Sequence, residues 1–111
     1  MEILRLTDII DVLVNDVASS YNVDAEDMSC KQKAIEVTMA RDVCFYIMYN
    51  VLGMTYLASS KALGYRGHDM ALRAVRRVDD ILEENTVFSL LAKSAIKKYR
   101  GLLDEWKIEQ D

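Results

Sequence analysis

The 111-residue chain contains no proline and only four glycines, and these two counts limit its fold more than any other feature. Proline breaks helices and glycine weakens them, so the residues that usually interrupt a helical chain are scarce here. Hydrophobic residues make up 51% of the chain and charged residues 29%, which is typical of a globular protein and too apolar for disorder. We therefore expect an all-α fold with short connections, formed by residues 1–111 as one domain.

Six helices are predicted, the four longer ones from apolar residues at three- and four-residue spacing and the two shorter ones from the residues that can cap them. Each of the six is preceded by a side chain that can cap a helix, so the helices are expected to begin near Thr7, Asp24, Thr38, Thr55, Asp69 and Thr86. Residues 29–36 show no clear period and are expected to form a loop. Gly53 and Gly64 are expected to end the third and fourth helices, because glycine adopts the left-handed backbone that closes many helices.

Several classes of function find no support in the residues. The chain has a single histidine, and Cys30 and Cys44 lack metal-ligand spacing, so we expect no metal site and a buried thiol at Cys44. No nucleophile is paired with a base and no glycine-rich nucleotide loop is present, so we expect neither catalysis nor a cofactor. The apolar runs are too short to span a membrane and no signal peptide precedes the first helix, which predicts a cytoplasmic protein.

Charge is distributed unevenly along the chain. The formal net charge of −4 argues against non-specific binding of polyanions by the whole surface. Residues 61–77 nevertheless carry five cations and one acid, a local balance of +4, whereas residues 78–84 carry four acids. An acidic protein with one basic patch can still bind DNA through that patch.

The basic patch contains the stretch GYRGHDMALRAVRRV (64–78), a turn with two glycines followed by a helical pattern. A helix over 55–63, a turn over 64–68 and a helix over 69–82 match a helix-turn-helix, whose second helix places its first residues against base edges in the major groove. Arg66 and His68 lie just before that helix. Helix–glycine–helix corners with surface arginines also occur in proteins that never bind DNA, so the pattern alone leaves both alternatives open.

The last two predicted helices also carry cations. Arg73, Arg76 and Arg77 can form a solvated face paired with Asp80 at i+4 spacing. Arg73 remains a candidate phosphate contact because it lies nearest the start of its helix. The cations of the last helix are interpreted as an exposed face, formed by Lys93, Lys97, Lys98 and Arg100.

From about Ile9 to Trp106 the chain resembles the C-terminal DNA-binding domain of the DnaA family, the bacterial chromosomal replication initiators. The resemblance rests on three segments in order, VASSYNVDAEDMSCKQK (17–33), VTMARDVCFYIMYNVLGMTYLASSKALG (37–64) and GYRGHDMALRAVRRVDDIL (64–82). The last segment occupies the place of the family signature, G-G-R-D-H-T-T-V. The resemblance implies a six-helix, Trp-repressor-like domain with a helix-turn-helix at about 55–82. It also implies recognition of short duplex boxes at replication origins and some promoters.

The same resemblance implies which residues contact DNA. Arg66 and His68 match the arginine and histidine of the signature. Lys33 takes the place of the basic residue that reaches the minor groove, where the family usually has arginine and lysine fits less well. The candidate DNA-binding residues are Lys31, Lys33, Lys61, Arg66, Gly67, His68, Asp69, Met70 and Arg73.

The chain departs from the signature at four positions. Gly67 replaces the aspartate, Asp69 and Met70 replace the two threonines, and Tyr65 replaces the second glycine, so at least three of the family's base and phosphate contacts are absent. Capping of the helix that follows is the favoured role for Asp69, ahead of accepting a hydrogen bond from a cytosine amino group. These departures support a second hypothesis, a protein-interaction module that keeps the DnaA-like fold but has lost box recognition. In that case Tyr65 and Met70, exposed at the tip, contact a protein partner.

The chain contains no GxxxxGK[ST] phosphate loop, so no nucleotide site is expected and the ATPase module of full-length initiators is absent. The N-terminal sequence MEILRLTDII favours a free-standing domain over a fragment. A domain of this kind inherits only the DNA-binding half of an initiator, which suggests a role in control of replication initiation or in transcriptional regulation.

Overall fold

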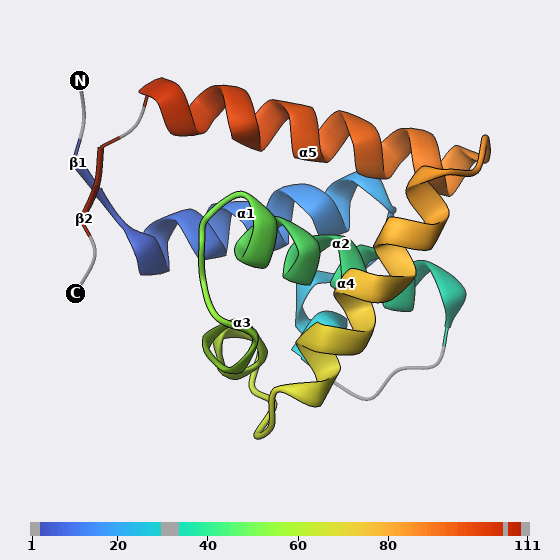
Figure 1. The fold of residues 1–111 in the computed structure, drawn as a ribbon, viewed down its shortest axis with the longest axis horizontal. Helices are drawn as coiled ribbons and strands as arrows, with labels where there is room; N and C mark the ends of the chain where they lie inside the picture. The colour runs from blue at the N-terminus through green and yellow to red at the C-terminus, as the bar shows by residue number, and fades with distance from the viewer. Residues whose placement is uncertain (1–2, 30–33, 106, 110–111) are drawn as a thin grey trace.

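The computed structural model describes residues 3–29, 34–105 and 107–109. Within these ranges the chain is all-α, as predicted, and its five α-helices are α1 (Leu6–Ser20), α2 (Ile35–Asn50), α3 (Tyr56–Ala62), α4 (Asp69–Leu82) and α5 (Val87–Glu105). The short second helix predicted after Asp24 is a 3₁₀ helix, η1 (Ala25–Ser29). Two three-residue strands, β1 (Ile3–Arg5) and β2 (Lys107–Glu109), pair in parallel next to α1 and α5, which the sequence did not predict (Figure 1).

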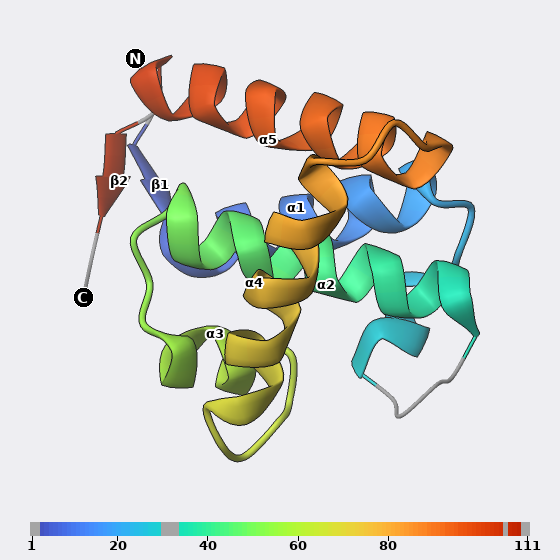
Figure 2. The same ribbon diagram turned by 45° about the vertical axis from the view of Figure 1, so that its right-hand side comes forward.

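The central helix of the fold is α2, which contacts each of the other helices. Every side chain from Arg41 to Met48 is buried, so this helix has no solvent face over two turns. Helices α1 and α5 pack on one side of it, α3 lies on the other, and α4 crosses α2 from beside α3 to the start of α5 (Figures 1 and 2). Cys44 is fully buried, as predicted, and this burial raises the pKa of its thiol, which keeps the sulfur in the unreactive neutral form.

Two predicted helix starts are wrong by a few residues. Helix α2 begins at Ile35 rather than near Thr38, because the Ala34 carbonyl already accepts the Thr38 N–H at 3.0 Å, so residues 35 and 36 are helical and not part of a loop. Helix α1 begins at Leu6, with Arg5 in the capping position in place of Thr7. Neither helix has a side-chain cap at its start, so neither start has the sequence pattern that identifies one.

The remaining predicted ends of α2, α3 and α5 agree with the structure. Thr55 and Thr86 cap α3 and α5, because their hydroxyls accept the backbone N–H groups of Ala58 and Ser89, three residues further on, at 3.0 and 3.1 Å. Gly53 and Gly64 follow α2 and α3 with positive φ angles of 73° and 87°. No helix in the described ranges is long and apolar enough to cross a membrane.

Candidate nucleic-acid interface

The α3–turn–α4 unit is held in a sharp chain reversal by backbone hydrogen bonds at the end of α3. The Tyr65 N–H donates to the Ser60 carbonyl and the Gly64 N–H to the Lys61 carbonyl, both at 3.0 Å. This is the pattern of a Schellman motif, which needs a left-handed residue after the helix. Gly64 supplies that residue at a φ of +87°, where a side chain is strained. The turn therefore projects residues 65–68 at one end of the molecule (Figure 2).

A side chain of α3 caps the start of α4. Ser60 is fully buried, and its hydroxyl accepts the Ala71 N–H at 3.1 Å. Ala71 is the third residue of α4, whose N–H an N-capping side chain normally satisfies. The bond ties α3 to α4 and fixes the direction in which α4 leaves the turn.

The predicted cap at Asp69 is wrong. The N-cap position belongs to His68, which makes no side-chain capping bond, and Asp69 is the first residue inside the helix. The physical reason is that Ser60 already accepts the N–H that an N-cap side chain would take. The Asp69 side chain is 68% exposed and its carboxylate lies 3.4 Å from the His68 Nε2, whose own side chain is 62% exposed. Both groups thus face solvent at the start of α4.

Tyr65 anchors the turn to the body of the protein. Its hydroxyl accepts a hydrogen bond from the Arg41 Nη1 at 3.1 Å and donates one to the Met28 carbonyl at 3.2 Å. Its ring lies edge-on to Phe45, with 6.1 Å between centroids. Tyr65 is therefore half-buried and not the exposed tip residue that the sequence predicted. The tyrosine in place of the signature's second glycine connects the turn to α2 and η1.

A second buried contact fixes α4 against α2. Arg77 donates from Nε and Nη2 to the two carboxylate oxygens of Asp42, at 2.7 and 2.8 Å. Asp42 is 1% exposed, and its carboxylate raises the pKa of Arg77, which keeps the guanidinium charged. The interpretation of Arg77 as part of a solvated face paired with Asp80 is therefore wrong, because its partner is 35 residues away on another helix.

The remaining candidate residues lie around these anchors. Lys61, Arg66, Gly67 and Arg73 are exposed, and Met70 is half-buried. Lys31 and Lys33 lie outside the described residues. A hollow of about 410 Å³ lies at the turn, lined by Gly64, Tyr65, Arg66, Gly67, Asp69 and Met70. A Cβ added at Gly67 would meet nothing within 4 Å, so the position where the signature has aspartate is open surface.

The arrangement has the electrostatics of an anion-binding surface with one opposing charge. The N-terminus of a helix carries a partial positive charge and unpaired N–H groups that favour phosphate. Arg66, His68 and Arg73 lie at or within two turns of the start of α4. None of them takes part in the buried contacts described above that hold the helix. Asp69 places a carboxylate in the same first turn. The surface suits a polyanion that also offers a hydrogen-bond donor at one point.

No family model matches the chain. The chain is similar in sequence to proteins named chromosomal replication initiator protein DnaA, among them those of Rickettsia canadensis (strain McKiel), Rickettsia massiliae (strain Mtu5) and Rickettsia rickettsii (strain Sheila Smith). In each case the identity is 28% over 69 residues, which cover 62% of this chain and 15% of the relative. The chain thus spans only a small part of the length of these relatives. The matches and the all-α fold confirm the resemblance to a DnaA C-terminal domain.

Proposed function

We propose, from the similarity to DnaA, that this chain is a non-catalytic protein that binds double-stranded DNA sequence-specifically through the α3–turn–α4 unit as a helix-turn-helix. The observation that carries the proposal is the exposed start of α4, which Ser60 caps from α3. The Tyr65 hydroxyl and the Asp42–Arg77 pair hold the same unit against α2. A helix pair held in this way need not be ordered when DNA binds, which favours a specific contact over a loose one.

Each exposed candidate has a role that follows from its place. Arg66 precedes α4 and matches the signature arginine, so it is proposed to pair bidentately with a guanine, worth about 1–3 kcal/mol of discrimination. Arg73 lies about one turn after the start of α4 and is proposed to contact a phosphate. Lys61, in the last turn of α3, is proposed to do the same. Lys33 is proposed to reach the adjacent minor groove, as the resemblance implies, and Lys31 to contact the DNA.

The sequence read by this protein is proposed to differ from the boxes of the family. Because Ser60 supplies the cap, the Asp69 carboxylate is available to accept a hydrogen bond from a cytosine amino group. This reverses the order in which the two roles of Asp69 were favoured from sequence. Gly67 and Met70 offer no hydrogen-bonding side chain where the signature has aspartate and threonine. The biological setting proposed is control of replication initiation or of transcription at DnaA-like sites.

A protein-interaction module that has lost box recognition is the second candidate. The observation that favours it is the exposed carboxylate of Asp69 in the first turn of α4, where it opposes phosphate, on a chain with a net charge of −4. Tyr65 is no longer a contact candidate, since its hydroxyl is bonded to Arg41 and Met28. Met70 remains one.

Selection of duplexes from a random oligonucleotide pool separates the two candidates. The pool is selected with the wild-type chain at a low and at a near-physiological salt concentration. An enriched motif supports DNA reading and identifies the bases that face Arg66 and Asp69. A pool that stays random at both salt concentrations contradicts DNA reading and favours the interaction module.

A further inference from the structure

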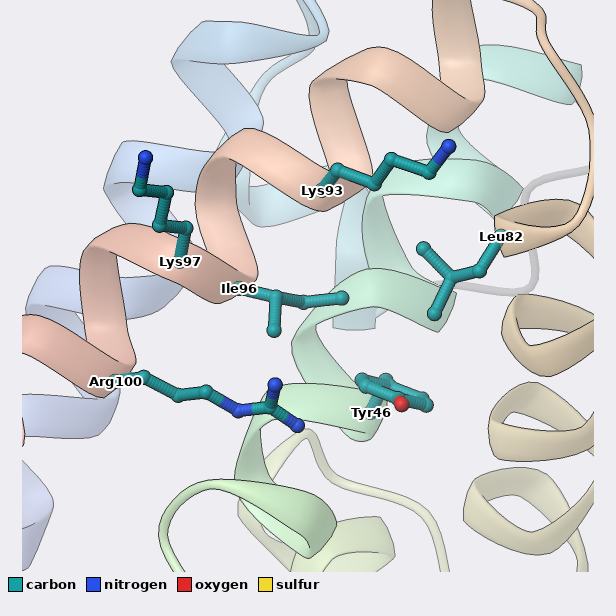
Figure 3. A pocket seen from close by; sticks show the side chains of 6 residues that line it. All are labelled: Tyr46, Leu82, Lys93, Ile96, Lys97 and Arg100. Atoms are coloured by element: carbon teal, nitrogen blue, oxygen red, sulfur yellow. The ribbon is translucent and has the colours of Figure 1, made fainter.

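A second hollow lies at the opposite end of α4 from the turn, where α5 crosses α2 and the last turn of α4. Its volume is about 330 Å³, and it is lined by Tyr46, Leu82, Lys93, Ile96, Lys97 and Arg100 (Figure 3). This volume is at the small end of the range of about 300–1,000 Å³ in which proteins bind ligands. Helix α4 has 14 residues, so Leu82 lies roughly 20 Å along its axis from Asp69. The hollow is therefore separate from the candidate DNA-binding surface.

The floor of this hollow is apolar and its edges are cationic. Ile96 and the Tyr46 ring are largely buried, at 5% and 8% exposed, and Leu82 closes one side. Lys93 extends toward Leu82 and Arg100 extends toward Tyr46, so the two cations reach in from the two ends, while the ammonium of Lys97 points outward (Figure 3). An apolar floor between two cations fits a ligand with one apolar group in the middle and a negatively charged group on each side of it.

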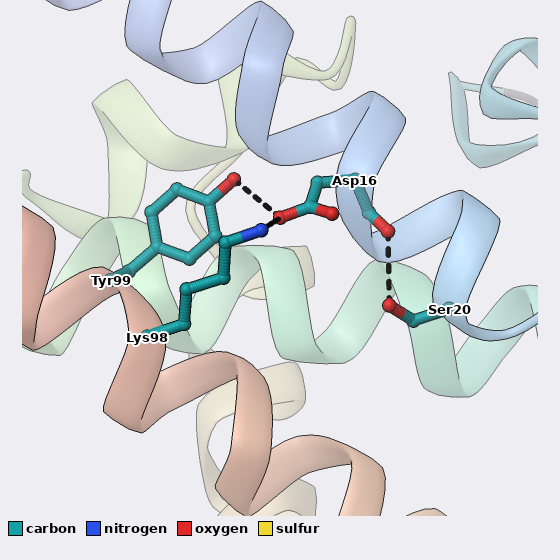
Figure 4. A network of polar contacts seen from close by, with 4 residues as sticks. All are labelled: Asp16, Ser20, Lys98 and Tyr99. Atoms are coloured by element: carbon teal, nitrogen blue, oxygen red, sulfur yellow. Dashed lines mark hydrogen bonds and ion pairs between the residues drawn. The ribbon is translucent and has the colours of Figure 1, made fainter.

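The cations around the hollow lack acidic partners in the part of the chain that the structure describes. Lys93, Lys97 and Arg100 form no ion pair with any described residue, although the chain carries more acids than bases. The neighbouring Lys98 differs, because its Nζ pairs with the Asp16 carboxylate at 2.5 Å, next to the Tyr99 hydroxyl (Figure 4). The charge around the hollow is thus not neutralised within the described fold.

The cationic face also continues into an exposed apolar side chain. Leu90 is 55% exposed and lies three residues before Lys93 and seven before Lys97, a spacing that places all three on one side of α5. The distance along the helix axis from Lys93 to Arg100 is about 10 Å, two helical turns. A second helix laid along α5 can place charges and an apolar anchor at the same intervals.

We propose that this face of α5 and its hollow are the docking site for an acidic amphipathic helix of a partner protein. The partner helix inserts one large apolar side chain over Ile96 and Tyr46, and carboxylates on either side of that anchor meet Lys93 and Arg100. Leu90 extends the apolar contact by one turn. Duplex DNA is a poorer fit, because its bases are paired and stacked and its phosphate backbone offers no group for the apolar floor.

The test is selection from a displayed library of helical peptides randomised on one face, with the wild-type chain as bait. The enriched peptides are then measured against the Lys93→Gln, Arg100→Gln double variant, which takes no part in the selection. The account predicts a consensus with one aromatic or leucine anchor and acidic residues three to four positions on each side of it. A selected peptide should bind the double variant about tenfold or more weakly, since two charge contacts are lost. Leu90→Ser should weaken the same peptide.

The control is the Arg66→Ala, Arg73→Ala double variant, which alters the other end of α4. It should bind the selected peptide as the wild type does, and the Lys93→Gln, Arg100→Gln variant should bind duplex as the wild type does. Peptide docking and DNA binding can thus fail independently. An unenriched library, a consensus without acidic residues, or equal binding by the double variant overturns the proposal.

Discussion

Ser60 on α3 accepts a hydrogen bond from the Ala71 N–H in the first turn of α4, at 3.1 Å, and is itself fully buried. One hydroxyl thus caps the start of the second helix of the candidate reader and couples it to the first. Because Ser60 takes the capping bond, the Asp69 carboxylate is left out of the capping role.

Ser60→Ala should destabilise the protein by about 1–2 kcal/mol, because it removes a helix cap and leaves a buried N–H without a partner. Ser20→Ala is the matched control, since the Ser20 hydroxyl is exposed and bonds only the Asp16 carbonyl of its own helix (Figure 4). That control should change the free energy of unfolding by less than about 0.5 kcal/mol. Urea unfolding measures both values, and equal effects of the two substitutions would contradict the capping role.

Arg77→Met should cost about 3 kcal/mol of stability, because it leaves the Asp42 carboxylate buried without its partner. Asp42→Asn should cost less, since the Arg77 side chain is 45% exposed and its charge can turn to solvent. Arg76→Met, one residue earlier on the exposed face of α4, is the control and should have little effect. Thermal and urea unfolding rank the three variants. A loss of stability in Arg76→Met as large as that in Arg77→Met would contradict a stabilising role for the Asp42–Arg77 pair.

Stability should fall as pH rises from about 10 to about 12. Burial raises the pKa of Tyr21 to about 12, and the Tyr21 hydroxyl donates to the Phe88 carbonyl at 3.0 Å. The pKa of Tyr99 is also raised, first by burial and then by its hydrogen bond to Asp16. A folded-state pKa above the unfolded value of 10.0 means that the folded chain holds more protons in this window, so the stability contributed by these two tyrosines is full below pH 10 and is lost as the pH rises above it.

The measurement is the urea midpoint of the wild type and of Tyr21→Phe at pH 8, 10 and 11. The phenylalanine variant should start from a lower midpoint, because it lacks the hydrogen bond, and should lose less between pH 10 and 11. Parallel pH profiles for the two proteins would show that Tyr21 does not carry the effect.

Asp69→Asn should raise affinity for duplexes of random sequence, because it removes an anion from the first turn of α4, where phosphate is expected. If Asp69 reads a cytosine, the same change should lower the preference for the selected motif over random duplex. Fluorescence anisotropy with both duplexes measures the two effects. A variant that matches the wild type on both would place Asp69 away from the DNA.

The sequence predicted the helix ends correctly where a capping threonine or a terminating glycine lies next to the end. Thr55, Thr86 and Gly64 act within a few residues of their own positions, so their roles were visible in the sequence. The start of α2 was misplaced because Ala34 caps it without a side-chain bond. The strand pair was missed because its two segments lie at opposite ends of the chain.

The sequence predicted which residues form the candidate surface. It did not predict the contacts that hold this surface in place. The Ser60, Tyr65 and Asp42 contacts join residues 11 to 37 positions apart, which periodicity cannot reveal. One sequence pattern did point to them. Arg41 and Asp42 interrupt an apolar run, and charged side chains buried in such a run need partners. Arg41 follows this rule, because it is 5% exposed and donates a hydrogen bond to Tyr65.

DNA reading by residues 64–78 is tested by the affinity of a pool-selected duplex for the wild type, Arg66→Ala and Arg100→Ala at two salt concentrations. The account predicts that affinity falls with rising salt, since phosphate contacts release counterions. It predicts a loss of about 1–3 kcal/mol for Arg66→Ala, whose side chain lines the hollow at the turn, and no loss for Arg100→Ala on α5. A duplex bound equally by all three proteins would contradict the assignment of residues 64–78 as the DNA-reading surface.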